Sequence, residues 1–474
     1  MKIDHALTPA ALSPRLGRLW RLSASKIRAI ERNHPPGRDT LVYTVDGRYT
    51  SRGWTEWTLG FRYGSALLQF DATGDRRFLE IGRRGTIEAM GAHLTDTGVH
   101  DHGFTIVSTY GNLLRLAGEG RIPRNEWERR CYETALRCSA AVQAHRWTAL
   151  GEREGFIHSF NGPHSLFVDT MRTLRALAVG HRLGQVLLEE GGARVPLLAR
   201  LVQHARTTAT HLVSEGRGRD VFDVRGRVAH EAIFNTRTGA FRCLSTQQGY
   251  SPFTTWSRGL AWAMLGFAEQ LEFLATVPAA ELAGEGGKPA VEAFMRRAAC
   301  DACDRYIEDA AADGVPYWDS GAPGLRGLGD HREKPADPFN DFEPVDSSAA
   351  AIAVQGLLRL GHYLRRRDTA RARRYWLAGL TVMRTLTGPP YLSAAANHEG
   401  LLLHSVYHRP NGWDHVPPGR RVPCGESSLW GDYHLREAAL YLQRVVRRDP
   451  YLVFWNGIGT NFNFCHPRIR GGRN

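Results

Sequence analysis

Two aspartates in the sequence could serve as an acid and a base. Asp101 lies in the polar segment HDHGF, residues 100–104, at the start of an apolar helical pattern. Its carboxylate could react, or it could cap that helix, because free N–H groups and the helix dipole favour a negative charge there. Asp169 lies two residues from both Phe167 and Met171, so in a helix it points away from their apolar seam. If a cavity lies on that side, desolvation raises the pKa of Asp169, as a general acid requires; otherwise Asp169 is solvated or pairs with a neighbouring helix.

A second group of residues could bind an anionic ring. In the segment 246–268, Gly249 and Pro252 interrupt the backbone just before an apolar helical pattern begins. Arg258 and Trp262 are four residues apart, so a guanidinium and an indole share one face near the start of this helix. The alternative is that Arg258 pairs with the end of a neighbouring helix and that Trp262 lies in the core.

The elements that must position these residues are mostly helices. Strand patterns are confined to two hairpins, residues 41–49 and 231–244. No repeat of fixed length is visible and no linker divides the chain, so a closed double ring of helix pairs in one domain, residues 1–474, fits better than a regular solenoid. Apolar residues recur at helical spacing in the segments 15–33, 56–70, 76–94, 104–117, 124–145, 165–183, 194–213, 254–275, 290–309, 346–364, 370–386 and 427–446.

The composition of these segments predicts which ring each belongs to. The segment 347–356 is apolar and rich in small residues, as expected of an inner helix that is packed on both sides. The segments 124–130 and 371–375 carry a charged face, which is typical of an outer helix.

The charge balance points to no macromolecular partner. The formal net charge is +13, but only four of the 61 basic residues are lysine. Such an arginine skew can arise from genome base composition, so we expect no nucleic-acid partner. No run approaches the roughly eighteen apolar residues that cross a bilayer, so we expect no membrane partner.

The cysteines and the N-terminus indicate a cytoplasmic protein. Seven cysteines are too few and too scattered for a disulfide scaffold, and their number is odd. Cys300 and Cys303 form a C-x-x-C without a second pair at zinc-finger spacing, so we expect no metal. The first residues contain no continuous apolar segment of the kind found in secretory signals.

Seven motifs, taken in order, resemble those of a known family. The chain is similar to the unsaturated glucuronyl hydrolases, glycoside hydrolase family 88, from about residue 54 to residue 444. The motifs are WTLGF at 57–61, HDHGF at 100–104, FVDTM at 167–171, TQQG at 246–249 followed by WSRGLAWA at 256–263, VPYWD at 315–319, DSSAAAI at 346–352 and SLWGDY at 428–433.

The resemblance implies a fold and a reaction. Members of the family are all-α (α/α)6 barrels, which agrees with the pattern of helices. They act on an unsaturated uronic-acid oligosaccharide, the product of a polysaccharide lyase, and remove the sugar that carries the C4–C5 double bond from its non-reducing end. The double bond, a vinyl ether, is hydrated to an unstable hemiketal, so the carboxylate-spacing rule for ordinary glycosidases does not apply. No cofactor is implied.

The resemblance also implies roles for individual residues. Asp169 corresponds to the acid/base of the family, and Asp101 to a second aspartate that positions the sugar and raises the pKa of the acid. Trp57 resembles the aromatic residue that stacks on the unsaturated ring. Where the family often has another tryptophan ahead of the Asp169 motif, Phe160 could substitute. The other corresponding site residues are His230, Gln248, Arg258 and Trp262.

One further loop could contact the leaving sugar. Residues 407–421 contain Pro417, Pro418 and Gly419, which predict irregular backbone. Trp413, Arg420 and Arg421 could hold that sugar, including a sulfated one, by charge-assisted hydrogen bonds. A solvated loop is the alternative.

Three other functions remain open from the sequence. The same ring of helices could carry a polysaccharide lyase or an ordinary glycosidase, because a fold hosts sites without dictating them. It could also be a non-catalytic carbohydrate-binding protein. The source polysaccharide and the oligomeric state are not predicted.

Overall fold

The computed structural model describes residues 1–36, 40–53, 56–218 and 220–459, so Trp54, near which the family resemblance begins, lies outside the described residues. The α-helices are α1 (Ser13–Asn33), α2 (Leu59–Thr73), α3 (Arg76–Ala89), α4 (His102–Thr105), α5 (Asn112–Gly118), α6 (Glu126–His145), α7 (Thr170–Thr173), α8 (Arg175–Arg182), α9 (Leu197–His211), α10 (Ser257–Leu274), α11 (Lys288–Asp309), α12 (Ser347–Leu364), α13 (Thr369–Leu386) and α14 (Leu429–Arg447). The strands are β1 (Leu41–Val45), β2 (Arg48–Ser51), β3 (Trp147–Gly151), β4 (Glu154–Ile157), β5 (Ser165–Phe167), β6 (Val186–Leu188), β7 (Arg194–Pro196), β8 (Glu231–Phe234) and β9 (Phe241–Ser245). The short 3-10 segments are η1 (Ala10–Leu12), η2 (Ala92–Thr95), η4 (Glu190–Gly192), η5 (Ala279–Glu285) and η6 (Pro323–Leu328), and η3 (Val107–Gly111) is a π-helix.

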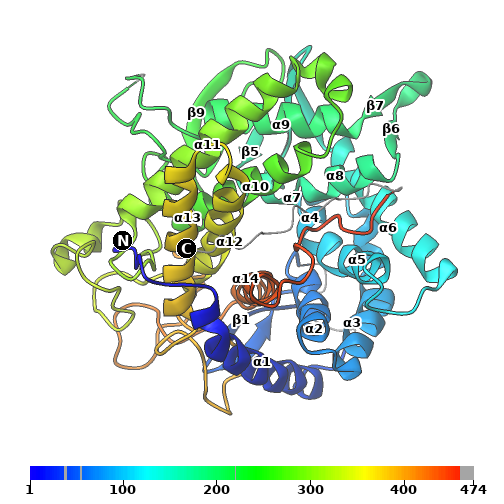
Figure 1. Cartoon of the computed structure of the whole chain (residues 1–474). Helices are drawn as coiled ribbons and strands as arrows, with labels where there is room; N and C mark the ends of the chain where they lie inside the picture. Colours follow the sequence, from blue (N-terminus) through cyan, green and yellow to red (C-terminus); the bar gives the residue numbers. More distant parts are fainter. Residues whose placement is uncertain (37–39, 54–55, 219, 460–474) are drawn as a thin grey trace, which may run out of the picture.

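The helices are arranged around a closed ring (Figure 1). On its inside, α2, α4, α7, α10, α12 and α14 contact one another in that order, and α14 returns to α2. A partner helix packs outside each inner position, as α3 does on α2 and α13 does on α12. The described helices therefore confirm the predicted all-α (α/α)6 barrel with short β-hairpins.

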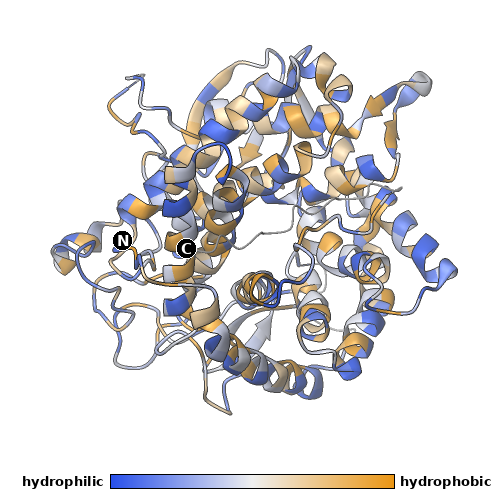
Figure 2. Cartoon of the chain, in the orientation of Figure 1, coloured by the Kyte–Doolittle hydropathy of each residue, from blue (hydrophilic) through white to orange (hydrophobic). Residues whose placement is uncertain are grey.

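The two rings differ in how far their residues are buried. Every residue of α10 is buried, and so is every residue of α12 except His362. An inner helix is covered on all sides, which explains the apolar and small residues of segment 347–356. The outer helices bury one face only, and Figure 2 shows hydrophilic residues on their outward faces. The predicted inner and outer assignments are confirmed.

The predicted helix at residues 165–183 is wrong in its first part. Residues 165–167 form strand β5, which pairs with β8, and Asp169 lies between that strand and the short helix α7. The apolar spacing of this segment is compatible with a helix, but pairing with a distant strand overrides it. The structure also contains two hairpins that were not predicted, β3–β4 and β6–β7.

The inner helices begin at one end of the ring. Trp57, two residues before α2, stacks on Trp430, at the start of α14, with ring centroids 5.2 Å apart. Arg258, at the start of α10, reaches Asp346, which precedes α12, at 3.3 Å. Most of the predicted site residues therefore come from this one end. None of the described helices is long and apolar enough to span a membrane.

A buried ion network joins three inner positions below that end. Arg172 on α7 pairs with Glu269 on α10 and with Glu437 on α14, whose Oε2 lies 2.7 Å from Nη2 of Arg172. Arg175 approaches the other oxygen of Glu437 at 3.5 Å, and Gln355 donates a hydrogen bond to Glu437. All of these side chains are buried and have lost their hydration, so each charge depends on its ion-pair partners to compensate for that loss.

We expect Glu437→Gln to destabilise the protein by about 3–5 kcal/mol, because it leaves the buried Arg175 without its ion pair and Arg172 with Glu269 alone. Urea unfolding would measure this as a lower midpoint. Glu126→Gln is the matched control, since Glu126 pairs with Arg129 and Arg130 on the exposed surface of α6, and its midpoint should hardly change. A similar midpoint for both variants would contradict a stabilising role for the network.

Candidate active site

Aromatic side chains from the starts of the inner helices form the floor of the candidate site. Phe104 on α4 lies between Trp57 and Trp262, with ring centroids 5.5 and 4.8 Å away. Trp262 also contacts His434, and only 1% of its surface is exposed. The structure thus places Trp262 in the core beneath the site, as the alternative interpretation proposed, whereas Trp57 is only half-buried.

The two aspartates are brought together beside one histidine. Nε2 of His100 lies 3.6 Å from Oδ1 of Asp169 and 3.9 Å from Oδ1 of Asp101. Asp101 precedes α4 and Asp169 precedes α7, yet neither carboxylate accepts a capping hydrogen bond from its helix. Capping therefore does not explain either aspartate, and both side chains are largely buried.

The sheet β5–β8–β9 fixes Asp169 and His230 next to each other. The N–H of Val168 donates to the carbonyl of His230 at 3.0 Å, directly beyond the β5–β8 pairing. Nδ1 of His230 accepts the N–H of Gln247 at 3.0 Å, and burial lowers the pKa of His230 to about 4. The ring is therefore neutral with its proton on Nε2, and that atom has no hydrogen-bond partner among the described residues.

The expectation that the pKa of Asp169 is raised is wrong for the ligand-free protein. Burial alone would raise the pKa of Asp169, but the imidazoles of His100 and His230 outweigh it, and its pKa lies below the ordinary value. Burial instead raises the pKa of Asp101 to about 6, because His100 only partly offsets it and Asp169 adds repulsion. As the pH falls, Asp101 is therefore the first of the two aspartates to take up a proton, while Asp169 stays ionised.

Arg258 is a buried guanidinium with four acceptors. It donates to the carbonyls of Val406 and Tyr407 at 2.6 and 2.8 Å and to Oε1 of Gln248 at 2.7 Å. Its pairing with Asp346 means that Arg258 does bind the start of a neighbouring helix. Its guanidinium also lies over the rings of Trp256 and Trp430 at 4.6 and 4.9 Å. Arg258 therefore fixes Gln248 and the loop 406–407 at the end of the ring.

Phe160 and Trp413 are exposed aromatic residues near this end. Phe160 is 57% exposed and stacks on His100 with centroids 6.1 Å apart, which agrees with a position beside the two aspartates. Trp413 is 41% exposed, contacts Tyr407 at 5.3 Å and lies under the guanidinium of Arg52. Both could stack on a sugar.

Arg420 and Arg421 lie farther along the same loop. Arg420 donates to the carbonyl of Phe339 at 3.0 Å and covers its ring, whereas Arg421 is exposed. Within the described part of the chain, no contact joins either arginine to the two aspartates.

Sequence reasoning missed His100, Trp430 and Glu56. His100 and Trp430 stand inside the motifs HDHGF and SLWGDY, but nothing in one sequence separates them from core residues. Glu56 interacts electrostatically with both Asp101 and Tyr407, and burial raises its pKa. A glutamate one residue before a motif carries no recognisable signal.

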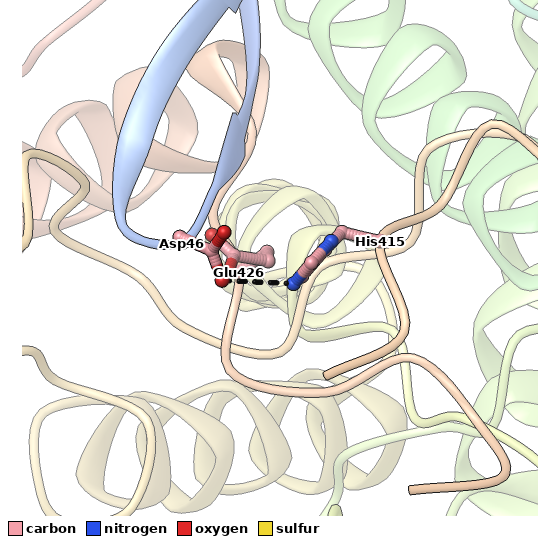
Figure 3. Close-up of side chains that lie close together, drawn as sticks. All are labelled: Asp46, His415 and Glu426. Atoms are coloured by element: carbon pink, nitrogen blue, oxygen red, sulfur yellow. Dashed lines mark ion pairs between the residues drawn. The ribbon is translucent and has the colours of Figure 1, made fainter. Parts of the chain in front are cut away.

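Three side chains outside the carboxylate pair could hold a cation (Figure 3). The ligand atoms of Asp46, His415 and Glu426 all lie within 4.8 Å of one another. Nε2 of His415 is 3.1 Å from Oδ1 of Asp46, and Glu426 accepts hydrogen bonds from the hydroxyl of Thr44 and the N–H of Gly47. These contacts account for the arrangement, which fastens the loop of Trp413 to the β1–β2 turn.

Comparison with known proteins places this geometry in context. No family model matches the chain. The curated unsaturated glucuronyl hydrolase of Bacillus sp. (strain GL1) is 26% identical over 422 residues, which cover 86% of this chain and 92% of the relative. The predicted resemblance is confirmed. The unsaturated chondroitin disaccharide hydrolase of Streptococcus pyogenes serotype M1 is 24% identical over 410 residues, which cover 84% of each chain.

The solved structures agree on the fold. A crystal structure of an unsaturated glucuronyl hydrolase specific for heparin, 18% identical, superposes with a TM-score of 0.70 and covers 93% of this chain and 100% of that one. The likeness to this hydrolase therefore extends over most of the ring of helices.

We expect a carboxyl of the ligand-free protein to titrate near pH 6 and to be lost in Asp101→Asn, because burial holds Asp101 protonated below that pH. Infrared difference spectra across pH 4–8 would measure the protonated-carboxyl signal. Asp319 and Asp414 also have pKa values of about 6, so part of the signal should persist and the comparison of the two proteins is decisive. An unchanged signal would show that Asp101 is already ionised.

Proposed function

We propose that the chain is an unsaturated glucuronyl hydrolase, which removes the 4,5-unsaturated uronic acid from the non-reducing end of polysaccharide-lyase products. The observation that carries this proposal is the buried pair Asp101 and Asp169 on a ring of helices shared with hydrolases of that name. Relatives named for chondroitin disaccharides and for heparin support glycosaminoglycan-derived substrates. A cytoplasmic location belongs to the same proposal and is supported by free thiols at the described cysteines.

In the proposed reaction, an acid protonates C4 of the vinyl ether and water adds to C5. Asp169 gives its proton to C4 and then accepts one from the attacking water, so one side chain serves both halves of the step. The hemiketal formed at C5 opens by breaking its bond to the ring oxygen, and the exposed hemiacetal at C1 releases the next sugar. This chemistry needs no metal or nucleotide.

Asp169 must gain a proton before it can act as the acid. The substrate is itself a carboxylate, and a negative charge that enters the buried pair raises the pKa of both aspartates. Asp101, with a pKa of about 6 in the free protein, is the nearest source of that proton. Trp57 stacks on the unsaturated ring in this proposal, and His230, with a free N–H, donates to the substrate. The positive ends of the inner helices favour the anion.

We expect Asp169→Asn to lower turnover by at least ~10²-fold, because asparagine can neither give nor accept the proton. Loss of the ultraviolet absorbance of the conjugated double bond would be followed with defined unsaturated disaccharides. Asp75→Asn is a matched control, since Asp75 caps α3 at the surface and asparagine caps equally well.

The same assay separates the alternatives. A rise in absorbance from intact polymer would indicate a lyase, action on saturated sugars would indicate an ordinary glycosidase, and binding without turnover would indicate a carbohydrate-binding protein. No loss of absorbance with chondroitin, hyaluronan, heparin and ulvan lyase products would refute the proposed function.

We expect Arg421→Ala to raise KM for a sulfated disaccharide by at least about tenfold and to leave KM for the unsulfated one unaffected, because it removes a charge-assisted hydrogen bond worth about 1.5–3 kcal/mol. Arg421 is exposed and free to reach a sulfate, whereas Arg420 is engaged with Phe339. Steady-state kinetics on the matched pair of disaccharides would measure the difference. An unchanged KM for the sulfated disaccharide, or the same change in KM for both substrates, would leave the loop without a role in sulfate recognition.

A further inference from the structure

His100 is the charged neighbour that Asp101 and Asp169 share. Its Nε2 faces both carboxylates, and only 1% of its surface is exposed. Neither ring nitrogen has a hydrogen-bond partner among the described residues, since 3.6 and 3.9 Å exceed ordinary hydrogen-bond lengths. The imidazole therefore acts on the aspartates through its charge and position.

Two phenylalanine rings hold the imidazole in place. Phe160 stacks on it at 6.1 Å with planes 22° apart, and Phe167 meets it edge-on at 5.7 Å with planes 89° apart. Phe167 belongs to strand β5, so the sheet that positions Asp169 also positions His100. The distance from the imidazole to the carboxylates is thus fixed by packing.

Other ionisable groups face the same cluster. His230, His158 and His204 also lie near it, but burial lowers their pKa values to about 4, 4 and 3, so they are neutral near pH 7. Arg146 interacts with the cluster while it binds backbone carbonyls, and Glu56 adds a negative charge near Asp101. Burial alone would lower the pKa of His100 as well, but the two aspartates outweigh it and raise that pKa. His100 is the histidine of this group that carries a positive charge.

We propose that His100 is a positioning residue that decides which of the two aspartates carries the proton. Its charge keeps Asp169 ionised in the free protein, so that Asp101 is the first of the two to take up a proton as the pH falls. When the anionic substrate arrives, its carboxylate offsets the imidazolium, and the proton can pass to Asp169. This inference rests on the proposed hydrolase function and adds a control on its proton.

Replacing His100 should shift the pH profile in a known direction. Without the imidazolium, the pKa of Asp169 rises by about 1–3 units, the size expected for one opposite charge at this range. If Asp169 acts as the acid, activity is lost as pH rises through its pKa, so the basic limb of kcat/KM moves to higher pH. If Asp169 acts as the base, activity is lost as pH falls, so the acidic limb moves to higher pH. Either limb thus moves upward, and the one that moves identifies the role.

The test compares His100→Asn, His100→Gln and Asp101→Asn across pH 4–9. Glutamine can present an N–H but no positive charge, so both His100 variants should shift upward together. Asp101→Asn removes a negative charge and should shift the limb of Asp169 downward, because coupled groups titrate as a pair. His204→Gln is the matched control, since it replaces a buried neutral histidine and should leave the limbs where they are.

Infrared titration of the carboxyls measures the same shift without substrate. A fall in kcat with unmoved limbs, or a wild-type profile in His100→Gln, would overturn the proposal while leaving the hydrolase function intact. If the wild-type protein turns over no unsaturated disaccharide, the hydrolase function fails, and the infrared titration alone decides. A higher carboxyl pKa in His100→Asn than in the wild-type protein then supports the proposed role of His100, and an unchanged carboxyl pKa overturns it.

Discussion

Burial of the inner helices on every side is the constraint on which the rest of this structure depends. A polar side chain on such a helix has no access to water, so it must find its partner on a neighbouring helix. Arg172 on α7 does so with Glu269 on α10, and Arg258 on α10 does so with Asp346 ahead of α12. The same ion pairs also hold adjacent helices together, so the site residues at the starts of these helices are held in fixed positions.

Charge and burial oppose each other within the carboxylate pair. Asp101 and Asp169 are similarly buried, yet the pKa of Asp101 is raised and that of Asp169 is lowered. The difference arises mainly because His100 lowers the pKa of Asp169 more than burial raises it, whereas His100 only partly offsets the burial of Asp101 and Asp169 adds repulsion there. Desolvation alone, which motivated the expectation for Asp169, is therefore an insufficient guide wherever histidines share the cavity.

The ring of helices could be predicted from the sequence because apolar periodicity is a local signal. Segments 347–356 and 371–375 even revealed which ring they belong to, since burial on one or two sides changes composition. Strand β5 could not be predicted in this way, because it pairs with β8, as Phe167 does with Glu231, and these residues lie far apart in the sequence. Motif resemblance located Asp169 and His230, but only the pairing of β5 with β8 explains why they are neighbours.

Closure of the ring between α14 and α2 joins the last described helix to one of the first. Trp430 from α14 stacks on Trp57 in the floor of the candidate site, and the guanidinium of Arg258 lies over its ring. During synthesis on a ribosome, the chain therefore makes nearly every component of the site long before the site exists. Until α14 emerges and packs against α2, the apolar surface of α2 and the charge of Arg175 lack the cover that α14 provides, so the nascent protein exposes apolar surface through most of its translation.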